Sequence, residues 1–186
     1  MGDAVNQKPK HLFAICQCGK VKLEAIGAPI LTAACYCSDC QQAGHQIEQL
    51  PSAPPVLGAD GGTSFVLYRK DRVHCATGQE HLEERRLGPD SPTRRVVATC
   101  CHSAMFLDFT KGHWLSIYRN RIPDGAPPLE MRTMTSKRPA GVTIPDDVPA
   151  YEHHSGKFMR KLLGAWIAMG FRRPEVTLGR TATRAQ

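Results

Sequence analysis

The cysteines of this 186-residue chain constrain its fold more than any other feature, because seven of the eight fall in three short clusters. The clusters are Cys16 and Cys18; Cys35, Cys37 and Cys40; and Cys100 and Cys101. Clustered thiolates at such spacing are typical of zinc sites. Seven ligands divide into four, which close a tetrahedral structural site, and three, which leave one position open for a substrate or water. A single six-sulfur cluster is less favoured, because zinc rarely accepts six soft ligands.

Disulfide bonds are the other use for so many cysteines, and the N-terminus argues against them. The opening segment, MGDAVNQKPKHLF, lacks the apolar core and the cleavage site of a signal peptide. No apolar run is long enough to cross a bilayer. Disulfides persist mainly in oxidising compartments. We therefore expect a cytoplasmic protein with reduced, metal-binding cysteines and no membrane partner.

Short apolar segments separated by Gly and Pro predict a mainly β fold. We expect strands near residues 11–15, 21–26, 30–36, 63–68, 72–76, 81–87, 94–99, 104–109 and 115–122. A short helix should follow the second cluster, over 39–49, and a C-terminal helix capped by Ser155 should span 156–171. The Pro-rich stretch 123–149 reads as irregular. We divide the chain into a zinc-binding domain, 11–120, and a segment, 121–186, that contains the irregular stretch, the helix and a basic tail.

The spacing within each cluster suits a shared ion. Residues i and i+2 of a strand face the same side, so Cys16 can act with Cys18, and Cys35 with Cys37. Cys40 should lie on the first turn of the following helix, where backbone N–H groups favour a thiolate. Cys75 stands alone and reads as a small apolar side chain.

Two cysteine motifs carry a resemblance to a known family. Segments 16–21 (CQCGKV) and 35–41 (CYCSDCQ), followed by a late cysteine element, resemble the glutathione-dependent formaldehyde-activating enzymes and their centromere protein V relatives. The resemblance runs from about His11 to Tyr118. It implies a tent-like arrangement of small antiparallel sheets, a structural zinc on the first and last cysteine pairs, and a second zinc on the middle triad that meets glutathione. All seven clustered cysteines are then zinc ligands, and Cys35, Cys37 and Cys40 are the catalytic residues.

The late element departs from the family pattern, Cys-x-x-Cys-Gly-Ser-Pro-Leu. Residues 98–105 read ATCCHSAM. Aligning the ending puts Ala98 at the first cysteine, and aligning Cys100 with the first puts Ser103 at the second. Adjacent residues of a strand face opposite ways, so Cys100 and Cys101 can bind one zinc only if the strand ends there. His102 is the alternative fourth ligand.

The resemblance implies carbon–sulfur lyase chemistry on glutathione–aldehyde adducts of the S-hydroxymethylglutathione type. A zinc with three thiolates carries net negative charge and is a weak Lewis acid, but it can bind a substrate thiol as thiolate. Arg69, Lys70 and Arg72 are candidates for the carboxylates of glutathione.

Two alternatives remain open. The net charge of +7 and the pI near 9.1 allow a non-catalytic zinc module that binds protein or nucleic acid through its basic surface. Only 6% of residues are aromatic and no nucleic-acid motif is present, so nucleic acid is the weaker partner. Alternatively both zincs are structural, and the second is capped by a residue of the C-terminal segment.

Overall fold

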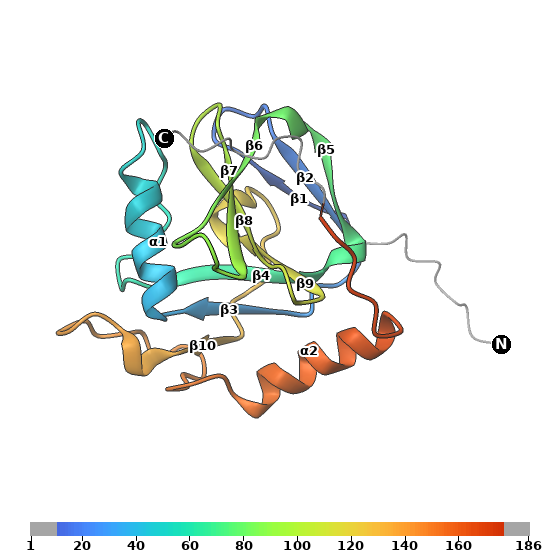
Figure 1. Ribbon diagram of the computed structural model, residues 1–186. Helices are drawn as coiled ribbons and strands as arrows, with labels where there is room; N and C mark the ends of the chain where they lie inside the picture. The colour runs from blue at the N-terminus through green and yellow to red at the C-terminus, as the bar shows by residue number, and fades with distance from the viewer. Residues whose placement is uncertain (1–10, 177–186) are drawn as a thin grey trace.

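The structure is a computed structural model that describes residues 11–176. Within that range ten strands form two sheets, and two α-helices complete the fold (Figure 1). The strands are β1 (His11–Ile15), β2 (Lys22–Ile26), β3 (Leu31–Cys35), β4 (Thr63–Arg69), β5 (Val73–Thr77), β6 (Leu82–Arg85), β7 (Thr93–Ala98), β8 (Ser103–Phe109), β9 (Trp114–Tyr118) and β10 (Met131–Thr133). The helices are α1 (Ser38–Glu48) and α2 (Gly156–Ala168). The predicted mainly β fold, with one helix after the second cysteine cluster and another near the C-terminal end, is confirmed.

The smaller sheet has the order β1-β2-β5, and the larger has the order β10-β3-β4-β9-β8-β7-β6. All neighbouring strands are antiparallel except β10, which runs parallel to β3 and pairs Met131–Thr133 with Ala33–Cys35. The expectation that 123–149 is irregular throughout is therefore wrong at β10, because a three-residue strand is too short to show an alternating pattern. The division at residue 120 stays a prediction, although β10 adds a strand to the larger sheet.

The two-residue period of β4 divides the core into two clusters. Val66 and Tyr68 pack with side chains of β1 and β2 between the two sheets. Phe65 and Leu67 point the other way, into a cluster that includes residues of both helices. Alternate residues of one strand thus serve opposite faces, as pleating requires. The larger sheet is buried on both sides along this strand.

The two strands predicted at 63–68 and 72–76 exist as β4 and β5, but they lie in different sheets. A 3₁₀ turn over Lys70–Arg72 carries the chain from one sheet to the other. Lys70 within it is buried, and its ammonium lies 2.8 Å from Asp108 Oδ1. The polar turn is therefore anchored inside the fold.

Both helices place a few apolar residues against the larger sheet. The buried residues of α1 are Cys40, Ala43, Gly44 and Ile47. The Ser155 hydroxyl accepts a hydrogen bond from the Phe158 backbone N–H at 3.1 Å, which confirms the predicted cap of α2. In the described part of the chain neither helix has the length and apolarity to span a bilayer. The basic tail residues Arg180 and Arg184 lie outside the described range.

Candidate metal centres and their pocket

The first and third cysteine clusters meet although they are far apart in sequence. The four sulfurs of Cys16, Cys18, Cys100 and Cys101 all lie within 4.8 Å of one another. Cys16 Sγ lies 3.6 Å from Cys18 Sγ and 3.8 Å from Cys100 Sγ, and the Cys18 and Cys100 sulfurs are 3.3 Å apart. A tetrahedron with zinc–sulfur bonds of 2.3 Å has sulfur–sulfur edges of about 3.8 Å. We call these residues the four-cysteine group, and its sulfurs fit one tetrahedral ion.

The adjacent residues Cys100 and Cys101 can both join the four-cysteine group because strand β7 ends before them. β7 stops at Ala98 and β8 starts at Ser103, so Cys100 and Cys101 lie in a turn instead of a strand. His102 closes the turn with a φ of 51°, in the left-handed region. Its Nδ1 lies 2.8 Å from the carbonyl oxygen of Pro51, and His102 is not part of the four-cysteine group.

A buried serine ties the two halves of the four-cysteine group together. The Ser103 hydroxyl lies 3.1 Å from Cys101 Sγ and accepts a hydrogen bond from the Gln17 backbone N–H at 2.9 Å. Burial opposes ionisation of Cys101, but hydrogen bonds from Ser103 and nearby backbone groups lower its pKa to about 6. Arg121 also donates to the Ser103 hydroxyl, at 3.3 Å, and its charge interacts with Cys16 and Cys101. These neighbours would offset part of the negative charge of four thiolates.

The middle cluster forms a second group from six residues of chain. Cys35 ends β3, Cys37 is the N-cap of α1, and Cys40 lies on the first helical turn, as predicted. Their sulfurs also lie within 4.8 Å of one another. Hydrogen bonding with Cys37 raises the pKa of Cys35 to about 12. Hydrogen bonds from Cys35 and Cys40 hold the pKa of Cys37 far below its usual value. This triad thus has three ligands that could hold a metal ion.

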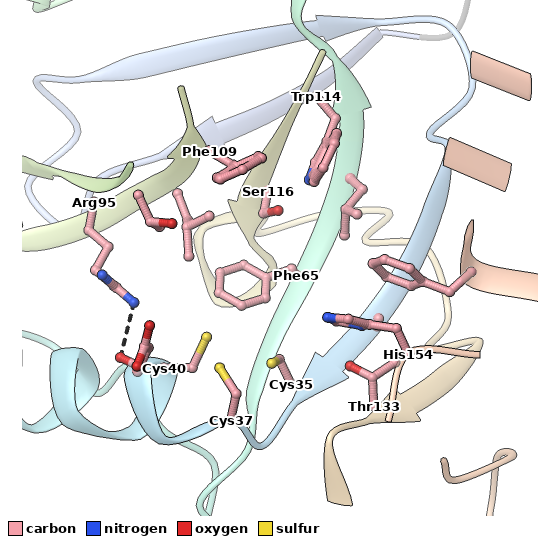
Figure 2. Close-up of a pocket in the computed structure, with 16 residues that line it drawn as sticks. Cys35, Cys37, Cys40, Phe65, Arg95, Phe109, Trp114, Ser116, Thr133 and His154 are labelled. Carbon is pink, nitrogen blue, oxygen red and sulfur yellow. Dashed lines mark hydrogen bonds between the residues drawn. The ribbon is translucent and has the colours of Figure 1, made fainter. Parts of the chain in front are cut away.

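The triad lies on the wall of a pocket of about 220 Å³ (Figure 2). Most of the other lining side chains are apolar: Ala33, Phe65, Leu67, Leu107, Phe109, Trp114 and Phe158. Polar or charged lining comes from Asp39, Thr93, Arg95, Ser116, Thr133 and His154. β3, β4, β7, β8 and β9 contribute residues, and so do α1, α2 and β10. The pocket is thus assembled from distant parts of the chain around a local cysteine site.

The polar lining differs from the candidates that the sequence suggested. Arg69, Lys70 and Arg72 do not line the pocket. Lys70 pairs with Asp108, and Arg69 pairs with Asp71 at 2.6 Å. The basic residues that line the pocket are instead Arg95 from β7 and His154 from the loop before α2. The His154 ring stacks on Phe158 with ring centroids 4.8 Å apart.

Cys75 lies apart from both groups. It is half-buried on β5, its thiol donates to the Thr77 carbonyl oxygen at 3.1 Å, and burial raises its pKa. Cys75 thus lies outside both cysteine groups, and its lack of a metal role stays a prediction.

Comparisons with known proteins support the resemblance over part of the chain. The family model described as glutathione-dependent formaldehyde-activating enzyme matches residues 11–50, which contain the first two cysteine clusters, and this match confirms the resemblance there. The match ends before Cys100. A solved structure of a Rhodobacter sphaeroides protein, a structural genomics target, is similar with a TM-score of 0.45 and 14% identity, and covers 62% of this chain and 92% of that one. A search of curated proteins gave no match.

Proposed function

We propose, from the match of residues 11–50 to the formaldehyde-activating family, that this chain is a zinc-dependent carbon–sulfur lyase acting on thiol–aldehyde adducts. The reaction is the reversible addition of a thiol sulfur to an aldehyde carbonyl. In the forward direction the carbon–sulfur bond forms, the carbonyl π electrons move to oxygen, and the thiol proton ends on the new hydroxyl. With formaldehyde the product is an S-hydroxymethyl adduct, and the reverse step releases thiol and aldehyde.

The observation that carries this proposal is the difference between the two cysteine groups. The four-cysteine group already offers the four sulfurs of a closed tetrahedral site. The triad offers three, and it opens onto a pocket. Closed sites are typical of structural zinc and open sites of catalytic zinc. We therefore assign the structural role to Cys16, Cys18, Cys100 and Cys101, and the reactive site to Cys35, Cys37 and Cys40.

A zinc ion bound by the triad would lower the pKa of a thiol that enters the remaining coordination position. The protein around it supplies orientation and a dry site. Phe65 lies next to the cysteines, and Phe109 and Trp114 continue the apolar lining beyond it (Figure 2). Excluding water there protects the aldehyde from hydration, which competes with addition of the thiol.

Metal analysis of the purified full-length chain tests the assignment of the two groups. Wild type should hold two zinc ions per chain. Cys37→Ser and Cys101→Ser should each hold one, because each removes a ligand from a different group. Cys75→Ser is the matched control and should keep two. Loss of both ions in either variant would contradict two independent sites.

Exchange NMR tests the reaction itself. Formaldehyde and glutathione interconvert slowly with their adduct, and the zinc-loaded protein should speed this exchange, whereas Cys37→Ser should not. No acceleration over buffer at full zinc occupancy would refute the lyase proposal, even if both metal sites are present.

A specific feature of α2 favours a second candidate, a non-catalytic zinc module that binds a protein. Three large apolar side chains at four-residue spacing on α2 are each more than half exposed, namely Met159, Leu163 and Ile167, and so is Phe171 in the turn after the helix. The exposed basic residues Lys157 and Arg160 lie nearby on the helix. An apolar row of this kind suits an amphipathic, acidic protein partner better than nucleic acid. A salt-dependent DNA shift would reverse that preference.

A further inference from the structure

Arg95 is a buried cation in the pocket whose hydrogen-bonding capacity is largely unused. Its residue exposure is 3%. Nη2 donates to the backbone carbonyl of Asp39 at 3.0 Å, whereas Nε and Nη1 have no hydrogen-bond partner within residues 11–176. A buried donor without a partner costs about 1–3 kcal/mol, and more when it is charged. The guanidinium is therefore poised to bind an acceptor that enters the pocket.

Arg95 and the triad face the same space. Figure 2 shows the guanidinium reaching from β7 towards the first turn of α1, close to Cys40, while His154 lies on the opposite side of the cysteines. Arg95 and all three cysteines line the same pocket of about 220 Å³, so one small molecule can reach both.

We propose that the pocket binds a small thiol bearing a single anionic group, with the anion at Arg95 and the sulfur at the open position of the triad. This inference rests on the proposed function, because it takes the same pocket as the thiol site. The anion is a carboxylate or a similar oxyanion, since guanidinium N–H groups pair strongly with such acceptors.

The size and lining of the pocket favour one anion on an apolar body. The volume of about 220 Å³ lies below the ~300–1,000 Å³ typical of pockets for drug-sized ligands. Glutathione carries two carboxylates and an ammonium group, so it needs partners for three charges. Of the lining residues that could pair with a charge, Arg95 is buried, whereas Asp39 and His154 are exposed to solvent, and the rest of the lining is mainly apolar. A mercaptocarboxylate matches this lining better than the tripeptide.

Cobalt substitution of the full-length protein gives a direct test that does not depend on turnover. A thiol that joins the triad should change the visible spectrum of the bound cobalt. The probes are 3-mercaptopropionate, 4-mercaptobutyrate, the neutral 3-mercaptopropionamide, and glutathione. Wild type should bind the better of the two mercaptocarboxylates at least tenfold more tightly than the amide or glutathione. This comparison needs no variant.

Two variants then locate the anion. Arg95→Met should weaken binding of the mercaptocarboxylates about 10- to 100-fold and leave the affinity for the amide unchanged, and Arg95→Lys should restore part of the difference. Arg85→Met is the matched control, because Arg85 pairs with Arg95 in the β6–β7 register but its side chain is 42% exposed. It should behave as wild type.

The contrary outcomes separate this inference from the proposed function. If thiols bind without preference for the anion, or if glutathione binds most tightly, the anion site is refuted and the lyase proposal survives. If Arg95→Met lowers cobalt loading, or weakens the amide equally, Arg95 serves only as a counter-charge to the thiolates and the inference falls. If no thiol changes the cobalt spectrum, both proposals fail.

Discussion

Replacing Asp108 with Asn tests whether a buried ion cluster holds the strands that carry the cysteine turn and Arg95. Asp108 lies on β8, and its side chain is 1% exposed. Its Oδ1 lies 2.8 Å from Lys70 Nζ, and Oδ2 accepts a hydrogen bond from Arg94 Nε at 2.8 Å. Arg94 in turn pairs with Glu84 at 3.1 Å. One carboxylate thus joins the turn after β4, strand β7 and strand β8.

The expected cost follows from what the substitution leaves behind. Lys70 is 2% exposed, and among the described residues its ammonium would keep only the new amide oxygen and the Phe109 carbonyl oxygen, at 3.3 Å, after Asp108→Asn. Removing one partner of a buried pair costs about 3–5 kcal/mol, because the remaining charge is uncompensated. Lys70→Met should cost less, about 1.5–3 kcal/mol, because Asp108 keeps Arg94. The free energy of unfolding of a native protein is only about 5–15 kcal/mol, so Asp108→Asn should remove a large part of it.

Urea unfolding followed by circular dichroism measures these costs, at a fixed saturating zinc concentration so that metal binding does not vary. The double variant of Asp108→Asn and Lys70→Met should be less destabilised than the sum of the singles by at least about 1 kcal/mol, since the two side chains touch. The reasoning would be refuted if Asp108→Asn lowered the free energy of unfolding by less than about 1 kcal/mol. It would also be refuted if the cost of the double variant equalled the sum of the two single costs.

Three further predictions use single side chains. Burial lowers the pKa of His113 below 6.5, so the unfolded chain gains that proton first on acidification. The free energy of unfolding should then fall below pH ~6.5, by up to about 1.4 kcal/mol per pH unit, and His113→Phe should flatten this part of the urea profile. If His113→Phe left the pH dependence of the free energy of unfolding unchanged, this prediction would be wrong. Cys75→Ser should change stability by less than about 1 kcal/mol and leave the zinc count at two; a lost ion would show a metal role. In Trp166→Phe the remaining indole, Trp114, lines the pocket, so its fluorescence should change when a thiol binds; a silent Trp114 would place the ligand elsewhere.

Local patterns predicted much of the fold and of the cysteine groups. The strand and helix segments around residues 11–49 rest on alternation, a short helical stretch and cysteine spacing, which depend on neighbours in sequence. The position of Cys40 on the first turn of α1 follows from the same local reasoning. The meeting of Cys100 and Cys101 with the first cluster could not be predicted from spacing alone, because it depends on the turn closed by His102.

The pocket was the part that sequence reasoning missed, for a physical reason. Its lining comes from both helices and most strands of the larger sheet, so no short motif encodes it. One signal was present nonetheless. Arg94 and Arg95 are adjacent in a β-branched run, and adjacent residues of a strand face opposite sides. The two cations therefore face opposite sides of β7: Arg94 pairs with the buried Asp108, and Arg95 lines the pocket with the triad.

The two cysteine groups also differ in how much a bound metal would stabilise the folded chain relative to the unfolded chain. The four-cysteine group joins the turn after β1 to the β7–β8 turn, across a separation of 84 residues between Cys16 and Cys100. The triad spans only 35–40. For a flexible chain, closing the longer loop costs about 2.5 kcal/mol more. An unfolded chain can therefore keep metal at the triad more easily, and binding to the unfolded state reduces the stabilisation that a metal gives. We infer that metal at the four-cysteine group, which ties one sheet to the other, contributes more to folding, whereas the triad is free to serve the pocket.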